Sequence, residues 1–111
     1  MRHRTTAAPD AWLRLQLEAT QALVTFCEQH KVRDPGWEAV LACNAALKAK
    51  DIKAAVEEFR MVPLGGNGCF NDWQPGVVIP TETPDYALAM FQALVERWSR
   101  LMSLSVEAYG A

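Results

Sequence analysis

Apolar residues recur every three or four positions along much of this chain, and that spacing predicts amphipathic α-helices. We expect four helices, over residues 10–30, 35–49, 51–61 and 84–108. Residues 1–9 carry no such pattern and are expected to be frayed. The sequence therefore predicts a single all-α domain over 10–111, a four-helix bundle-like fold with a long ordered Gly/Pro/aromatic loop at 62–83, before the last helix.

Each predicted helix start has a local signal. Asp10, Asp34 and Asp51 are each expected to cap a helix by accepting a free backbone N–H, and Pro35 is expected at the first helical position. The clearest start is the Thr-Pro-Asp sequence at 83–85. Only a very short link separates the second and third helices, and it lacks the Gly that usually ends a helix. We therefore expect these two helices to form either a tight hairpin or one bent rod.

The loop between the third and fourth helices is the most unusual part of the chain. Between Pro63 and Glu82 it holds 4 of the chain's 6 Gly and 3 of its 6 Pro. It also holds Phe70, Trp73 and the β-branched run at 77–79, whose exposure to water is unfavourable. We expect an ordered Ω-like loop packed on its own apolar side chains. Trp73 is either an exposed anchor for a partner or, as we favour, a side chain tucked into the core.

Composition narrows the possible partners. The chain has 111 residues and a net charge of −2, which argues against nucleic acid or an anionic membrane as a partner. No stretch approaches the roughly 18 apolar residues of a membrane span. Between Arg60 and Arg97 the chain has no Lys or Arg, and a basic protein partner would suit this segment. Its acidic residues are Asp72, Glu82, Asp85 and Glu96.

The three cysteines indicate a reducing compartment. Cys27, Cys43 and Cys69 cannot all pair within one chain, and none has the CxxC spacing of a zinc site or a redox pair. The N-terminal residues include basic side chains but no apolar run behind them, so we expect no signal peptide. A cytoplasmic protein with reduced thiols is the expectation.

The sequence contains little evidence for a catalytic site. A nucleophilic Cys69 would need a basic partner, and His30 is the credible candidate, although it lies far away in the sequence. The glycines at 65–68 lack the Lys-Ser/Thr ending of a phosphate-binding loop, so we interpret them as turn residues. Asn44, inside an apolar stripe, is either a satisfied buried polar group or a pocket residue. We predict no catalytic residue, no metal and no cofactor.

Two segments resemble a family of small uncharacterised bacterial proteins that carry a GGxGCFNDW loop. These segments are 61–73, MVPLGGNGCFNDW, and 93–102, ALVERWSRLM. The resemblance covers about the C-terminal half of the chain. Because no activity is established for that family, it implies at most a bacterial accessory protein. By analogy, small acidic helical proteins of this sort include immunity proteins that neutralise toxins.

The leading hypothesis is a non-enzymatic protein-binding module, in its most specific form an immunity-type inhibitor. Its predicted binding surface comprises Asn67, Cys69, Phe70, Asn71, Asp72, Trp73, Glu82 and Asp85. A second hypothesis places a small-molecule or catalytic site between the Gly65–Trp73 loop and the helices, with Asn44, Asn71 and Asp72 orienting the ligand. A third is a structural homodimer that pairs through broad apolar helix faces.

Overall fold

The computed structural model describes residues 8–33, 35–64, 69–75 and 79–110 of the chain. It contains four α-helices: α1 (Asp10–His30), α2 (Trp37–Lys48), α3 (Ile52–Arg60) and α4 (Pro84–Tyr109). A single 3-10 turn, η1 (Phe70–Asp72), interrupts the loop between α3 and α4, and the described residues form no strand. The predicted all-α fold of four packed helices with a long loop before the last one is confirmed.

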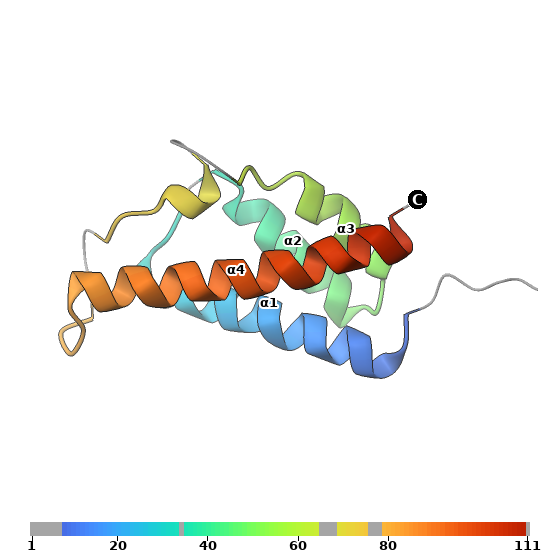
Figure 1. Ribbon diagram of the computed structural model, residues 1–111, viewed down its shortest axis with the longest axis horizontal. Helices are drawn as coiled ribbons and strands as arrows, with labels where there is room; N and C mark the ends of the chain where they lie inside the picture. Colours follow the sequence, from blue (N-terminus) through green and yellow to red (C-terminus); the bar gives the residue numbers. More distant parts are fainter. Residues whose placement is uncertain (1–7, 34, 65–68, 76–78, 111) are drawn as a thin grey trace, which may run out of the picture.

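The helices pack pairwise in chain order around a shared core: α1 contacts α2, α2 contacts α3, α3 contacts α4, and α4 returns to α1. Figure 1 shows α1 and α4 side by side and antiparallel, with α2, α3 and the segment that carries η1 above α4. At 26 residues, α4 is about 39 Å long and runs the length of the molecule. None of the described helices is long and apolar enough to cross a membrane.

Two of the predicted helix caps are confirmed. The Thr83 hydroxyl oxygen accepts a hydrogen bond of 3.1 Å from the backbone N–H of Tyr86, and Pro84 opens α4. Likewise, Asp51 Oδ1 accepts a hydrogen bond of 3.0 Å from the backbone N–H of Ala54. Each cap satisfies a backbone donor that has no partner inside its helix.

The predicted starts of the first two helices need correction. Asp10 is the first residue of α1 rather than its cap; Pro9 takes the cap position, and no side chain closes it. Asp34 lies outside the described residues, and α2 begins at Trp37, two residues later than predicted. The reason is Gly36, whose φ of 99° belongs to the left-handed region and ends any helical run that Pro35 could start.

A tight hairpin links α2 and α3, which decides between the two arrangements that the sequence left open. Lys50 adopts a φ of 61°, so a lysine takes the left-handed position that we expected of a Gly. The backbone N–H of Asp51 then donates to the carbonyl of Ala46 at 2.9 Å, closing the end of α2.

Aromatic side chains of the loop complete the core at the end of the bundle that α2 and α3 leave open. Phe70 is fully buried and its ring centroid lies 5.7 Å from that of Phe91, while Trp73 lies 5.1 Å from Phe91. Phe26 of α1 meets Trp73 edge to face at 5.7 Å. The loop is therefore anchored to both long helices, whereas the Ω-like interpretation predicted packing on its own apolar side chains. Of the run at 77–79, only Ile79 lies within the described residues.

Candidate functional site

The residues of the predicted loop surface differ in how exposed they are in the structure. Asn67 and the side chain of Asp72 lie outside the described residues, while Cys69 and Asn71 are half-buried. Phe70 is 0 % exposed and Trp73 is 7 % exposed, so the prediction that these two rings lie on the loop's binding surface is wrong. They are buried because their apolar area covers the end of the core. Favouring a tucked-in Trp73 was correct.

The remaining two residues of that predicted surface lie at the start of α4. Glu82 is half-buried in the turn before the helix, and Asp85 is exposed in its first turn. Beside the loop itself there is a hollow of about 340 Å³, lined by Leu64 and Asn71 together with residues of α4. Cys69 is not among its lining residues. The hypothesis of a small-molecule site between the loop and the helices stays a prediction, because this hollow includes Asn71 but not Cys69.

A larger hollow, the α1–α4 groove, lies between the two long helices and has a volume of about 720 Å³. Its apolar lining consists of Leu17, Ala22, Phe26, Tyr86, Met90 and Leu94. Its polar lining consists of Glu18, Gln21, Thr25, Gln29, His30 and Glu82. No Lys or Arg is among these lining residues, so the formal charges of the groove are acidic apart from the histidine.

His30 and Glu82 close one end of this groove. The Nε2 atom of His30 lies 2.8 Å from Oε1 of Glu82, and its Nδ1 atom lies 3.0 Å from the carbonyl oxygen of Phe26. The imidazole is 4 % exposed and stacks on the Phe26 ring at 3.8 Å. Both ring nitrogens face oxygen acceptors, so the two contacts are satisfied together only when the pair carries an extra proton, on the imidazole or on the carboxyl group.

Local backbone geometry positions this pair. His30 is the last residue of α1, and Lys31 follows it in the left-handed conformation, with a φ of 58°. Glu82 ends a turn in which its backbone N–H donates to the carbonyl of Ile79 at 2.8 Å. The hydrogen bond between the two side chains therefore joins the end of α1 to the start of α4 across 52 residues of sequence.

A catalytic pair of Cys69 and His30, which the sequence analysis considered and did not favour, does not fit this geometry. Because both nitrogens of His30 already face oxygen atoms, neither is directed at a thiol. Cys27 and Cys43 are buried in the core, and burial raises the pKa of the Cys43 thiol to about 12. Cys43 is therefore a neutral thiol at physiological pH and a poor nucleophile. Among the described residues, no cluster of His, Cys, Asp and Glu could hold a metal ion.

The sequence did not decide the role of Asn44. In the structure this residue belongs to a chain of side-chain hydrogen bonds behind the groove. Its Nδ2 donates to Oε1 of Gln21 at 3.2 Å, and Nε2 of Gln21 donates to the hydroxyl of Thr25 at 3.3 Å. Gln21 and Thr25 both line the groove, whereas Asn44 is buried behind them. Asn44 thus orients a groove residue rather than facing a ligand itself.

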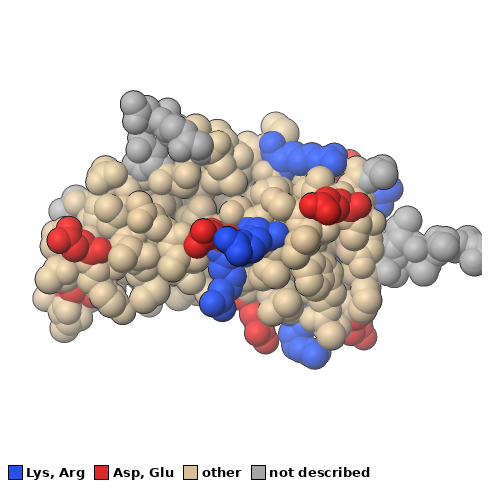
Figure 2. Space-filling model, in the orientation of Figure 1, with Lys and Arg blue, Asp and Glu red and all other residues tan. Residues whose placement is uncertain are grey.

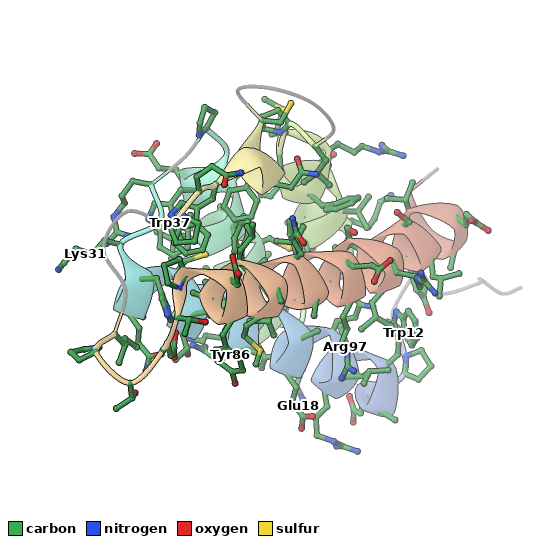
Figure 3. The ribbon with its side chains drawn as sticks, turned by 60° about the vertical axis from the view of Figure 1, so that its left-hand side comes forward. Trp12, Glu18, Lys31, Trp37, Tyr86 and Arg97 are labelled. Atoms are coloured by element: carbon green, nitrogen blue, oxygen red, sulfur yellow. The ribbon has the colours of Figure 1, made fainter. Side chains whose placement is uncertain are left out.

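Beyond the groove, the same side of the α1–α4 pair carries further exposed apolar side chains. A second hollow, of about 340 Å³, is lined by Leu15, Leu101, Arg97 and Arg100. Leu15 is 45 % exposed, Leu104 48 % and Tyr86 52 %. Figure 3 shows Tyr86, Glu18 and Arg97 on this side of the two helices, while Lys31 and Trp37 lie away from it.

We call this surface the outer face of α1 and α4. On α1 it consists of Leu15, Glu18, Ala22, Thr25 and Gln29. On α4 it consists of Tyr86, Met90, Ala93, Arg97, Leu101 and Leu104. Reasoning from the sequence predicted broad apolar helix faces in its homodimer hypothesis, but it did not identify which residues of the two helices stay exposed. The available signal was the width of the apolar stripe on each helix, which exceeds what one buried face needs.

None of the family models, curated proteins or solved structures compared with this chain matches it. The resemblance to small bacterial proteins with a GGxGCFNDW loop therefore remains a prediction. The argument for function rests on the geometry of the outer face and its groove.

Proposed function

We propose that this protein is a non-enzymatic protein-binding module whose interface is the outer face of α1 and α4, and that it binds an α-helix of a partner protein. The observation that carries this proposal is an exposed apolar surface centred on a groove of about 720 Å³ between two helices. Amphipathic helices commonly bind in such grooves and insert apolar side chains from successive turns. Exposed apolar patches of this kind often mark interaction sites.

The spacing of the exposed positions supports a helix as the occupant. Along both α1 and α4, the residues of the outer face follow one another at intervals of three or four. Two helices with such rows leave a valley into which the side-chain ridges of a third helix fit. At the centre of the α1 row lie Ala22 and Thr25, whose small side chains allow close approach.

Charge indicates the chemistry of the partner. Glu18 and Glu82 line the groove, and Asp85 is exposed at the same end as Glu82. In Figure 2 the left end of the molecule, where α4 begins, carries acidic but no basic side chains on the visible face. A helix that brings Lys or Arg to this end would meet charges of opposite sign, which favours correct orientation and fast association.

An immunity-type inhibitor is one form of this function, with a foreign basic protein as the occupant. It remains a prediction, since the groove favours a helix without specifying its source. A small-molecule ligand is the second candidate for the same groove. Its volume falls within the roughly 300–1,000 Å³ of ligand sites, and the His30–Glu82 pair supplies a polar group at one end.

Site-specific photo-crosslinking in the producing cells tests the protein-binding function. A photoreactive amino acid replaces Tyr86 on the outer face or, as a control, Met61, which is 71 % exposed at the end of α3. We expect a protein adduct from position 86 that is absent from position 61, with the partner peptide identified by mass spectrometry. Equal adducts from both positions, or none from position 86, would contradict the proposal. A small-molecule site predicts no protein adduct.

A further inference from the structure

We infer that the His30–Glu82 pair is a pH-dependent switch at one end of the α1–α4 groove. The pair holds that end closed while it carries an extra proton, and it releases Glu82 when the proton is lost. The switch rests on the proposed function, because it regulates the same groove. Three features of the pair support it: the number of protons that its contacts need, its burial, and its place at the end of α1.

The contacts of the pair need one more proton than a neutral imidazole and an ionised carboxylate carry together. Nδ1 of His30 faces the carbonyl oxygen of Phe26 at 3.0 Å, and Nε2 faces Oε1 of Glu82 at 2.8 Å. A neutral imidazole has a single N–H, so it donates to only one of these oxygens. Without the extra proton, a nitrogen lone pair therefore points at an oxygen lone pair across a hydrogen-bonding distance.

Burial and backbone position decide which of the two contacts breaks. The carbonyl of Phe26 belongs to α1, and the imidazole is held in place by stacking on the Phe26 ring at 3.8 Å. The imidazole also meets the Trp73 ring edge to face, with centroids 6.0 Å apart. The Glu82 side chain, in contrast, is 20 % exposed and belongs to a turn rather than a helix. We therefore expect the remaining N–H to stay on Nδ1 and the Glu82 carboxylate to move into solvent.

Other ionisable groups lie around the pair, but none of the described residues forms a further ion pair with His30 or Glu82. The ionisable residues on the neighbouring elements are Glu28, Lys31, Arg33, Asp85 and Tyr86, all of them exposed. Arg33 donates instead to the backbone carbonyl of Val32 at 2.8 Å. The loop contributes the uncharged Trp73, and the side chain of Asp72 lies outside the described residues.

The position of His30 places the extra proton on the imidazole. His30 is the last residue of α1, where the negative end of the helix dipole favours a cation. Imidazole is also a stronger base than a carboxylate. The closed state is therefore an imidazolium that donates to both oxygens, with Glu82 ionised.

Release of Glu82 changes the shape and the charge of the groove. The contact joins the two helices that form the groove walls, so its loss frees them from one another at that end. Loss of the proton also lowers the formal charge of the groove by one. A rise in pH should thus make this end more open and more acidic, which favours the basic end of the proposed helix partner. Because linkage is reciprocal, such a partner should displace the proton when it binds.

Nuclear magnetic resonance of the free chain tests the switch directly. His3→Gln leaves His30 as the single histidine, whose ring nitrogens report protonation and tautomer. Between about pH 5 and 8, where histidine commonly changes charge, we expect His30 to pass from two N–H groups to one on Nδ1. The backbone signals of Glu82 and Tyr86 should shift with the same midpoint. The signal of Ala108, at the other end of α4, should not.

Glu82→Gln is the matched variant, because its amide group both donates and accepts. Both contacts of a neutral imidazole are then satisfied, so the Tyr86 signal should not shift when His30 loses its proton. Urea denaturation gives a second measurement. Relative to Glu82→Gln, the wild-type ratio of folded to unfolded protein should fall roughly tenfold over the same pH range, since a buried acceptor loses its partner. Glu96→Gln, which removes an exposed partner of Arg100, is the control and should follow the wild type.

Equal pH dependence in the wild type and Glu82→Gln would overturn the switch. So would a His30 ring that loses its proton while the signals of Glu82 and Tyr86 stay fixed. If circular dichroism shows that Glu82→Gln does not fold, His30→Gln replaces it and should likewise fix the Tyr86 signal. All of these measurements use the free chain, so a failed switch leaves the helix-binding function to its own crosslinking test. Absence of a crosslink from position 86 contradicts that function without contradicting the switch.

Discussion

The imidazole of His30 and the carboxyl group of Glu82 lie 2.8 Å apart and connect the last residue of α1 to the turn before α4. The imidazole is buried beneath Phe26 and Trp73, whereas the Glu82 side chain remains 20 % exposed at the end of the α1–α4 groove. This contact fixes the width of the groove at that end, because it ties the two helices that form its walls.

Removing the carboxyl group of Glu82 should destabilise the protein. Glu82→Ala leaves a buried His30 nitrogen without its partner, and we expect a loss of about 1–3 kcal/mol in the free energy of unfolding. Glu82→Gln keeps a hydrogen-bonding group in place and should cost less. Urea denaturation measures both, with Glu96→Ala as the control. Glu96 forms an exposed pair with Arg100 at 3.4 Å, worth at most about 1 kcal/mol. An equal loss in Glu82→Ala and Glu96→Ala would show that the His30 contact adds nothing.

Truncating the loop tryptophan should have a large effect on stability. Trp73→Ala removes a ring that packs on Phe26 and Phe91, and we expect a loss of about 3–5 kcal/mol in the free energy of unfolding. Gln74→Ala, at the exposed neighbouring position, is the control and should change stability by less than about 0.5 kcal/mol. Calorimetry or denaturant titration measures the difference. If Trp73→Ala unfolds like the control, the loop is not part of the core.

Backbone strain at the α2–α3 hairpin predicts a stabilising substitution. Lys50 has a φ of 61°, which Gly adopts without a steric penalty, so Lys50→Gly should stabilise the fold by up to about 1 kcal/mol. The ion pair that Lys50 forms with Asp10, at 3.9 Å between exposed side chains, is worth little against this gain. Lys53→Gly, inside α3, should instead destabilise by about 1 kcal/mol. Thermal unfolding of the two variants should therefore shift in opposite directions.

Thiol reactivity should follow burial. Cys69 is half-buried, whereas Cys27 and Cys43 are in the core, so timed alkylation of the native protein should label Cys69 first. Cys27 and Cys43 should react only as the protein unfolds. Mass spectrometry of the labelled peptides gives the order. Rapid labelling of Cys43 in the native state would mean that its buried contact with Met102 of α4, 4.0 Å between the two sulfur atoms, opens far more readily than the structure indicates.

The Cys43 thiol also predicts a pH effect. Burial raises its pKa from 9.0 to about 12 in the folded protein. Above pH 9 the unfolded chain therefore binds fewer protons than the folded one, and stability falls as pH rises, by at most about 1.4 kcal/mol per pH unit from this group. Cys43→Ala should remove this part of the slope. Denaturation of both proteins on either side of pH 9 measures it, and parallel slopes would contradict the assignment.

Local signals in the sequence predicted most of the fold. The three-to-four-residue apolar spacing, the Thr83 cap and the Asp51 cap each act within a few residues, so the ranges of the four helices are close to those observed. The loop aromatics also gave a correct signal, because their apolar area requires burial. The predicted cap at Asp10 and the predicted start of α2 were wrong because the backbone conformation at Pro9 and Gly36, rather than a side-chain cap, sets the start of each helix.

The candidate site depended on information that no local pattern contains. The sequence placed His30 at the end of one helix and Glu82 before another, but only packing brings them within 2.8 Å. It also assigned Phe70 and Trp73 to a binding surface, although tertiary packing buries both. By itself the sequence determined the all-α class, the helices and an ordered loop, because hydrophobic periodicity and capping are local. Tertiary structure alone decided which side of α1 and α4 stays uncovered, since each apolar stripe is broad and the rest of the chain covers only part of it.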